Sequence, residues 1–305
     1  MQQLNLRVPD KIIDRIDEIC FKNGLSRSEI IRSSLVFYLN FLDNLDEFVS
    51  LRNLKFFDKE INIDRIRDTS ILNLKDFYIL IASTSSGAIG RKERDIVKID
   101  EAMLGKIMAR CVLTKIISLG ADPVMLISNF SVEYNPTGMK IYDGIVQEGA
   151  SVGVAEIIRG HTEENFKTDQ TSFSIVGIGV TKKRKLKFKL SRHGDSVFVL
   201  GEPKVGYEVV GSDLIDIKKL KQIREISYVH DMIPVGNEGI RQEILQFSNL
   251  SDYKIDLIDD LDIDIDKSAG PSTTILVTLN GRYKTEFNSL CDKNKMDVRY
   301  IGEII

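Results

Sequence analysis

The fold of the N-terminal region is decided by the stretch Gln3-Leu4-Asn5-Leu6-Arg7-Val8-Pro9. Apolar side chains at positions 4, 6 and 8 alternate with polar ones, which predicts a half-buried strand over residues 3–8. Pro9 ends this strand and favours a helix start, since its fixed φ suits the first helical turn. A lone strand leaves both edges unpaired, so we expect it to pair with the same strand of a second chain.

Two short helices are predicted to follow the strand. The first carries one apolar stripe at three- and four-residue spacing, formed by Ile12, Ile13, Ile16, Ile19 and Cys20. Asn23-Gly24 ends it, because both residues tolerate the left-handed backbone conformation. Ser26-Arg27-Ser28-Glu29 is a capping box that starts the second helix. One strand and two helices are too few to close a core alone, which indicates a homodimer or a higher oligomer.

The outward side chains of the predicted strand are Gln3, Asn5 and Arg7. Gln and Asn suit adenine and Arg suits guanine, so a two-stranded ribbon with these residues would fit the major groove of double-stranded DNA. Together with the helix start at residues 26–31, the stretch resembles the ribbon-helix-helix family of Arc/CopG-like repressors. The resemblance implies that Ser26, Arg27 and Ser28 hold a DNA phosphate at the start of the second helix.

The alternative for this segment is a dimerisation arm with polar outward residues. Residues 1–40 contain six Lys and Arg against five Asp and Glu, so affinity for DNA of arbitrary sequence should be weak. The formal net charge of the whole chain is −3, so any contact with DNA must be local.

Residues 44–68 are charged and irregularly patterned, and are predicted to be a helical extension and linker. Beyond them, alternating strands and helices predict an α/β (α+β) body. Strands are expected over 77–84, 124–132, 155–158, 172–181, 195–200, 275–279 and 298–301, and helices over 101–119, 139–152, 217–226, 238–247 and 285–293. We therefore expect four parts, at residues 1–43, 44–68, 69–190 and 191–305.

Several short motifs are spread over this body in a fixed order. They are Ser118-Leu119-Gly120-Ala121-Asp122-Pro123, Arg159-Gly160-His161-Thr162-Glu163, Gly194–Gly201, His230-Asp231, Ser268-Ala269-Gly270-Pro271 and Ile301-Gly302. The set resembles the PurM-like superfamily of aminoimidazole ribonucleotide synthetase, selenophosphate synthetase, thiamine-monophosphate kinase and the hydrogenase-maturation dehydratase. The resemblance implies a two-domain body with a dimeric β-barrel core, and ATP bound near the Gly160 loop and a polar turn at Thr84–Gly87.

The departures from that superfamily concern metal binding. Its active members carry aspartates after the first strand and before the Gly-Ala-X-Pro turn, because Mg²⁺ needs hard oxygen ligands to bridge phosphates. This chain has Ser83-Thr84-Ser85-Ser86 and Thr114-Lys115 at the two places. Lys cannot ligate Mg²⁺, although its charge can neutralise a phosphate. We therefore assign no catalytic residue and no metal ligand, and favour a body that is not an enzyme.

A ligand pocket is still predicted. Its candidate residues are Thr84, Ser85, Lys115, Gly160, His161 and Thr162, and its expected ligand is ATP or another phosphorylated small molecule. His161 has two interpretations that the sequence leaves open, a ligand contact or a structural hydrogen bond within its loop.

Composition excludes several other classes. Hydrophobic residues make up 43% of the chain and charged residues 29%, as in globular proteins rather than disordered ones. No apolar run approaches the ~20 residues of a membrane span, and no signal peptide is visible, so we expect a cytoplasmic protein without a membrane partner. Cys20, Cys111 and Cys291 are interpreted as reduced core residues. The basic run Lys182–Leu190 is predicted to be a strand with its lysines in solvent.

The leading hypothesis is a dimeric transcription factor whose degenerate PurM-like body senses a ligand. The first alternative is an ATP-dependent synthetase or kinase of the same superfamily, with an N-terminal module that dimerises or regulates it. The second is a purely structural assembly protein, which leaves the face formed by Gln3, Asn5 and Arg7 without a role.

Overall fold

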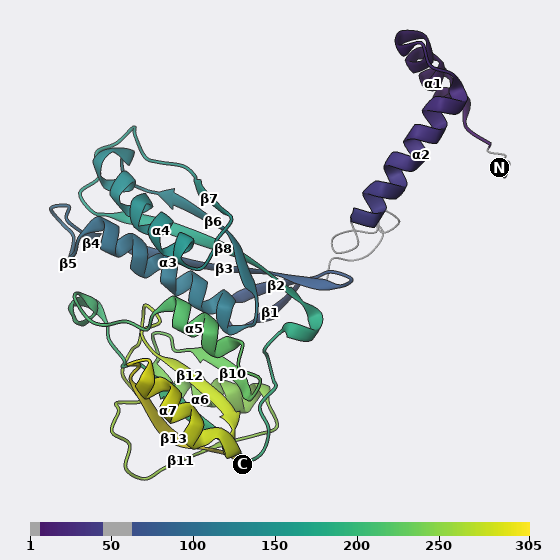
Figure 1. The fold of residues 1–305 in the computed structure, drawn as a ribbon. Coiled ribbons are helices and arrows are strands. Elements are labelled where there is room, and N and C mark those ends of the chain that lie inside the picture. Colours follow the sequence, from purple (N-terminus) through teal and green to yellow (C-terminus); the bar gives the residue numbers. More distant parts are fainter. Residues whose placement is uncertain (1–6, 45–62) are drawn as a thin grey trace. The chain divides into compact units, whose positions relative to one another are not determined.

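The computed structural model describes residues 7–44 and 63–305, with side chains of residues 36–44 left out (Figure 1). The chain divides into two compact units, residues 1–60 and residues 61–305. Each unit has its own elements and is described by itself.

The first unit contains the two predicted helices, α1 (Asp10–Asn23) and α2 (Arg27–Asn44). Gly24 ends α1 in the left-handed conformation, with a φ of 65°, as its lack of a side chain allows. No residue of α1 is buried, so its apolar stripe is open in the single chain. Of the predicted strand, Gln3 and Asn5 lie outside the described residues. Arg7 and Val8 are not in a strand here, since the predicted ladder requires a second chain.

Six strands form the first sheet of the second unit, in the order β1-β2-β3-β8-β6-β7. They are β1 (Ile63–Ile66), β2 (Thr69–Asn73), β3 (Phe77–Gly87), β6 (Asp122–Phe130), β7 (Glu156–Arg159) and β8 (Ser172–Lys182). Neighbouring strands are antiparallel except β6 and β7, which are parallel. A dimeric barrel built from this sheet remains a prediction.

Two parts of this sheet correct the sequence analysis. Ile63–Ile66 belong to a strand rather than to a linker, because they pair with β2 and bury Ile66. Thr84–Gly87 are the end of β3 rather than a turn, because they pair with Ser172–Ile175 of β8. In both places a partner strand supplies hydrogen bonds that local composition does not reveal.

Helices α3 (Glu101–Ser118) and α4 (Met139–Ser151) cover one face of this sheet (Figure 1). On β8, Phe173 and Ile175 are buried, whereas Val176, Ile178 and Val180 on the other face are only half-buried. The sheet therefore has a covered face and an open apolar face.

The two helices cross with their backbones in contact. A Cβ at Gly105 of α3 would lie 2.1 Å from the carbonyl oxygen of Ile141, and a Cβ at Gly144 of α4 would lie 1.9 Å from that of Ala102. Neither position accepts a side chain without a shift of the backbone.

Five antiparallel strands form the second sheet, in the order β10-β12-β9-β13-β11. They are β9 (Asp195–Leu200), β10 (Val229–Pro234), β11 (Ile255–Leu257), β12 (Ile275–Asn280) and β13 (Val298–Ile304). Side chains of α5 (Ile217–Arg224) and α7 (Lys284–Lys293) share a core with one face, and those of α6 (Gly239–Leu250) with the other. Every residue of β9 is buried, as its apolar run predicts.

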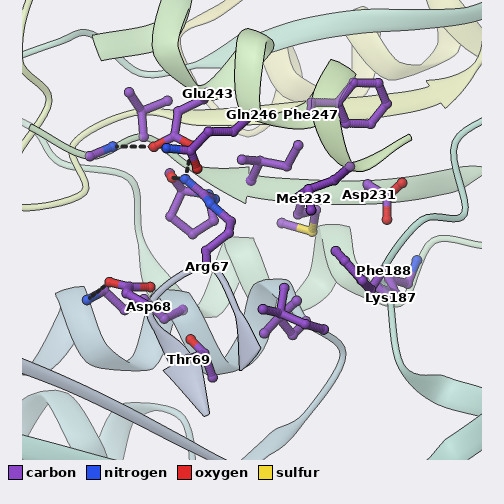
Figure 2. A pocket seen from close by; sticks show the side chains of 18 of the residues that line it. Arg67, Asp68, Thr69, Lys187, Phe188, Asp231, Met232, Glu243, Gln246 and Phe247 are labelled. Carbon is purple, nitrogen blue, oxygen red and sulfur yellow. Dashed lines mark hydrogen bonds and ion pairs between the residues drawn. The ribbon is translucent and has the colours of Figure 1, made fainter. Parts of the chain in front are cut away.

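The turn between β1 and β2 is tied to the second sheet through Arg67 (Figure 2). Its guanidinium forms an ion pair with Glu243 of α6 and donates a hydrogen bond, 2.8 Å long, to the carbonyl oxygen of Pro234. Arg67 has a φ of 57°, a left-handed conformation that is unfavourable for a residue other than glycine.

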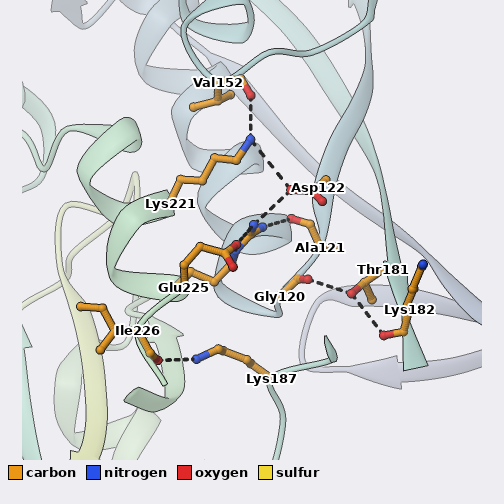
Figure 3. Close-up of polar contacts among 11 residues, drawn as sticks. Gly120, Ala121, Asp122, Val152, Thr181, Lys182, Lys187, Lys221, Glu225 and Ile226 are labelled. Carbon is orange, nitrogen blue, oxygen red and sulfur yellow. Dashed lines mark hydrogen bonds and ion pairs between the residues drawn. The ribbon is translucent and has the colours of Figure 1, made fainter. Parts of the chain in front are cut away.

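A second connection joins α5 to the end of α3 (Figure 3). Arg224 donates to the carbonyl oxygen of Ala121 at 2.7 Å and to the Asp122 carboxylate at 3.1 Å. Lys221 reaches the carbonyl oxygen of Val152 at 3.1 Å. The two sheets are therefore bound by side chains that cap the termini of helices and strands.

The basic run after β8 is a further correction. It is not a strand: β8 ends at Lys182, and Lys183–Lys185 form a short 3₁₀ turn. Lys187 is half-buried and donates to the carbonyl oxygens of Ile226 at 3.3 Å and Val229 at 2.6 Å (Figure 3). Burial lowers the pKa of Lys187. None of the helices in the described part of the chain is long and apolar enough to cross a lipid bilayer.

Candidate functional site

The capping box at the start of α2 is confirmed. The Ser26 amide donates to the Glu29 carboxylate at 2.8 Å, and the Glu29 amide donates to Ser26 Oγ at 3.3 Å. The side-chain hydrogen bond from Ser26 lowers the pKa of Glu29. This arrangement starts α2 at Arg27 and leaves the helix end exposed to solvent.

The other residues predicted to contact DNA in this unit differ in whether their side chains are free or already paired among the described residues. Arg7 and Ser28 are exposed. Arg27 is paired instead: its Nε and Nη2 donate to the two carboxylate oxygens of Asp17, each at 2.5 Å. A phosphate at the helix end would therefore compete with Asp17 for Arg27.

In the second unit, a cavity of about 560 Å³ brings Thr84, Ser85 and Lys115 together. Thr84 and Ser85 come from the end of β3, and Lys115 comes from the last turn of α3. Lys115 Nζ forms an ion pair of 2.5 Å with Asp68 and donates to the carbonyl oxygen of Ser83 at 3.0 Å. The predicted cationic centre is thus present, with a carboxylate already beside it.

Hydroxyl and thiol groups surround this centre. Cys111 Sγ lies 3.4 Å from Ser272 Oγ and 4.0 Å from Thr84 Oγ1. Ser86 Oγ is buried and has no hydrogen-bond partner among the described residues. A buried hydroxyl without a partner costs free energy.

The predicted loop Gly160-His161-Thr162 does not line this cavity within a single chain. It follows β7 and turns against the end of β6, where the His161 amide donates to Asn129 Oδ1 at 3.2 Å. The Phe130 amide donates to the carbonyl oxygen of His161 at 2.8 Å. Both contacts are made by the backbone of His161, and the two interpretations of its side chain stay predictions.

A neighbouring cavity of about 670 Å³ was not predicted from the sequence (Figure 2). The Arg67–Glu243 pair lies on one side, and Lys187 and Asp231 lie on the other. Burial lowers the pKa of Arg67 and raises that of Glu243, and in each case the partner's charge opposes the shift. The two cavities share Asp68, Lys115, Gly236, Asn237 and Ser272.

The sequence missed Arg67, Asp68, Asn237 and Glu243 as site residues. Arg67 and Asp68 lie in the turn between β1 and β2, inside the stretch interpreted as a linker. Asn237 and Glu243 come from the far half of the chain, and no motif marks them. Among the described residues, no three His, Cys, Asp or Glu side chains lie where they could jointly hold a metal ion.

Comparison with known families gives one match, at the N-terminus. Residues 2–40 match the family described as ribbon-helix-helix protein, copG family. No curated protein matches the sequence.

Solved structures resemble the chain over most of its length. Thiamine monophosphate kinase from Aquifex aeolicus has a TM-score of 0.57 at 14% identity, over 79% of this chain and 89% of that one. The hydrogenase maturation protein HypE from E. coli has a TM-score of 0.56 at 14% identity, over 74% and 79%. PurL from T. maritima, solved in complex with ATP, has a TM-score of 0.55 at 15% identity, over 82% and 43%.

At these identities the likeness shows the fold alone, and the fold is the PurM-like one that the motifs predicted. The protein therefore joins a ribbon-helix-helix segment of the copG family to a body with the PurM-like fold.

Proposed function

We propose that the protein is a homodimeric, sequence-specific DNA-binding regulator of transcription, whose PurM-like body binds a small anionic ligand such as a phosphorylated molecule. The observation that carries the proposal is the copG-family match over residues 2–40. In this proposal Gln3, Asn5 and Arg7 read base edges, and the helix end at Ser26 and Ser28 anchors a phosphate. Action in the cytoplasm is part of the same proposal.

Two open apolar surfaces support pairing of chains. The stripe of α1 has Ile12 51% exposed and Ile19 38% exposed. In the body, the open face of the first sheet carries half-buried Val176, Ile178 and Val180. Covering such surfaces removes apolar area from water, which favours a symmetric dimer in each unit.

The ion pair at Lys115 supports anion sensing. Lys115 is 15% exposed and Asp68 is 57% exposed, so the carboxylate can leave while the ammonium stays. An anionic ligand would replace the Asp68 carboxylate beside Lys115. Asp68 lies in the turn that follows β1, the first described strand after the DNA-binding segment. Binding at Lys115 therefore acts on the part of the body nearest to that segment in sequence.

DNA binding by the full chain tests the proposal. Oligonucleotides selected by the protein from a random pool should share a symmetric sequence. Arg7→Ala should weaken binding to that sequence by about 1–3 kcal/mol, because it removes a bidentate base contact. Arg15→Ala is the matched control, since Arg15 lies on the exposed surface of α1. Fluorescence anisotropy measures both, and equal affinity for selected and random DNA would refute the proposal.

An ATP-dependent synthetase or kinase is the alternative, which the fold of thiamine monophosphate kinase favours. It requires Mg²⁺ at the phosphates, yet Ser83–Ser86 and Thr114-Lys115 offer no carboxylate there. Release of phosphate from ATP by the pure protein, dependent on Mg²⁺, would decide for the enzyme.

A further inference from the structure

One face of α3 changes from apolar to cationic along the cavity that contains Lys115. The cavity is lined in turn by Leu104, Met108, Cys111 and Lys115, at spacings of three and four residues. These residues therefore lie on one side of the helix, and eleven residues span about 16 Å along its axis. The wall formed by α3 has an apolar end and a cationic end.

The side opposite the apolar end is aliphatic as well. It is formed by β4 (Ile89–Gly90), β5 (Val97–Lys98) and a 3₁₀ turn (Gly206–Val209), with Ile89, Val97, Ile99, Val205, Val209 and Val210 in the lining. Tyr207 in the turn donates a hydrogen bond of 2.5 Å to the carbonyl oxygen of Ile96, which holds the turn against β5. Val205 and Val210 are 47% and 39% exposed although both face the cavity.

The other end of the cavity is polar and carries little net charge. It presents Ser272 Oγ beside Cys111. Asn237 adds an amide. Lys115 is the cation of the lining and is already balanced by Asp68. One such pair is matched to a single anionic group and not to a chain of three phosphates, which needs several positive charges.

We propose that this cavity binds a linear amphipathic anion, with one anionic head at Lys115 and an aliphatic tail between α3 and the Gly206–Val209 turn. The proposal rests on the anion site of the proposed function and names the class of its ligand. The head displaces the Asp68 carboxylate from the Lys115 ammonium. The tail covers Val97, Val205 and Val210, whose exposed apolar surface drives the binding.

Alkyl phosphates of increasing length test the tail with the full-length protein. Isothermal titration calorimetry should show affinity rising about fourfold for each added methylene from butyl to octyl phosphate, as apolar burial predicts. Inorganic phosphate and ATP should bind far more weakly than octyl phosphate. Affinity that does not depend on tail length, or ATP binding as tight as that of octyl phosphate, would overturn the proposal.

Substitutions test where the head and the tail of the ligand lie in the cavity. Val205→Lys should weaken the binding of octyl phosphate about tenfold, because it places a charge in the aliphatic end of the cavity. It should leave the affinity for inorganic phosphate unchanged. Leu245→Lys is the matched control, since Leu245 is 52% exposed on α6 and lines neither cavity. Lys115→Met should weaken binding of both phosphates at least about tenfold, because it removes the charge beside the head group. An equal loss of octyl phosphate affinity in the Val205 and Leu245 variants would also overturn the proposed position of the tail.

The same measurements separate the two proposals. If inorganic phosphate binds at Lys115 and tail length has no effect, the amphipathic ligand is wrong and the anion-sensing regulator stands. If octyl phosphate binds with the predicted tail dependence and the full chain selects no DNA sequence, the ligand class is correct and the regulator is wrong. Labelling of Cys111 by N-ethylmaleimide, followed by mass spectrometry, gives a second readout, because bound octyl phosphate should protect a thiol in the middle of the cavity.

Discussion

At the scale of single residues, the proposed anion site centres on Lys115. Its ammonium is held by the carbonyl oxygen of Ser83, a fixed acceptor in β3, and by Asp68, a partner mostly exposed to solvent. The fixed acceptor keeps the charge at the end of the cavity, and the exposed carboxylate is the exchangeable one. A partly exposed pair of this kind contributes little to stability, on the order of 1 kcal/mol or less, so a ligand can replace it at small cost.

Two opposite charge changes test this role. Lys115→Asp should weaken binding of inorganic phosphate at least about tenfold, because it replaces an attracting charge with a repelling one beside Asp68. Asp68→Asn should strengthen binding, because it removes the competing carboxylate. Calorimetry with and without a chelator measures both, and we expect the chelator to have no effect. Tighter binding in the Lys115 variant would contradict the assignment.

At the scale of elements, the β1–β2 hairpin is the part that links the first sheet to α6. Its turn holds Arg67 at positive φ, which costs on the order of 1 kcal/mol for a residue other than glycine. The buried ion pair with Glu243 keeps it there. Breaking such a pair from one side leaves a buried charge unpaired, whereas removing both charges does not.

Arg67→Met should therefore lower the free energy of unfolding by about 3 kcal/mol at neutral pH, and adding Glu243→Met should restore much of the loss. Lys75→Met is the control, because Lys75 is exposed, and it should cost under about 1 kcal/mol. Urea unfolding of the full chain measures all three. A double variant no more stable than Arg67→Met would contradict the assignment of the loss to an unpaired Glu243.

The cost in Arg67→Met should also depend on pH. Burial already raises the pKa of Glu243 above its ordinary value of 4.5, and loss of Arg67 removes the charge that opposes this shift. As the pH rises above about 4.5, the unfolded chain releases this proton before the folded chain does, so the folded state becomes less favoured. The destabilisation should be small at pH 4 and larger at pH 7.

Elements with a clear apolar period could be predicted from the sequence. The stripe of α1 and the buried run of β9 each matched the observed element closely. Composition misled where pairing decides the structure: Ser85 and Gly87 suggest a turn, yet β8 holds them in a strand. The basic run after Lys182 alternated like a strand, but Lys187 is drawn inward by two carbonyl groups.

Only some residues of the candidate site could be predicted from the sequence, because the others are brought together by packing. Thr84, Ser85 and Lys115 stood out because they replace acidic residues in recognisable motifs. Asp68 and Glu243 belong to the same region of the folded chain, but one comes from a hairpin turn and the other from a helix 175 positions later. Their contacts are set by the packing of two sheets, which no local pattern encodes.

At the scale of the whole molecule, the chain combines two units that each leave apolar surface open. In the body, this surface is the face of the first sheet opposite α3 and α4, with Val176 and Ile178 at its centre strand. A two-fold axis through each unit would let one symmetry serve DNA half-sites and the body alike.

Charged side chains on the open face of the first sheet should therefore separate the PurM-like bodies of the two chains. Val176→Asp combined with Ile178→Asp should shift sedimentation of residues 61–305 from dimer toward monomer, because each buried aliphatic contact is replaced by a charge that must be desolvated. Leu245→Asp is the control on an exposed helix position and should leave the mass unchanged. A body that sediments as a monomer before any substitution would count against the predicted dimer.

The crossing of α3 and α4 at Gly105 and Gly144 has a consequence for how the ligand can change in evolution. Because two backbones touch at the crossing, α3 cannot retreat when a larger side chain appears on its cavity face. The added volume must come out of the cavity itself. For the proposed amphipathic ligand, larger side chains at Leu104 or Met108 would then shorten the tail that the cavity accepts, while the scaffold around them stays the same. Under the proposed sensing role, changes on this one helix face would be enough to alter the ligand.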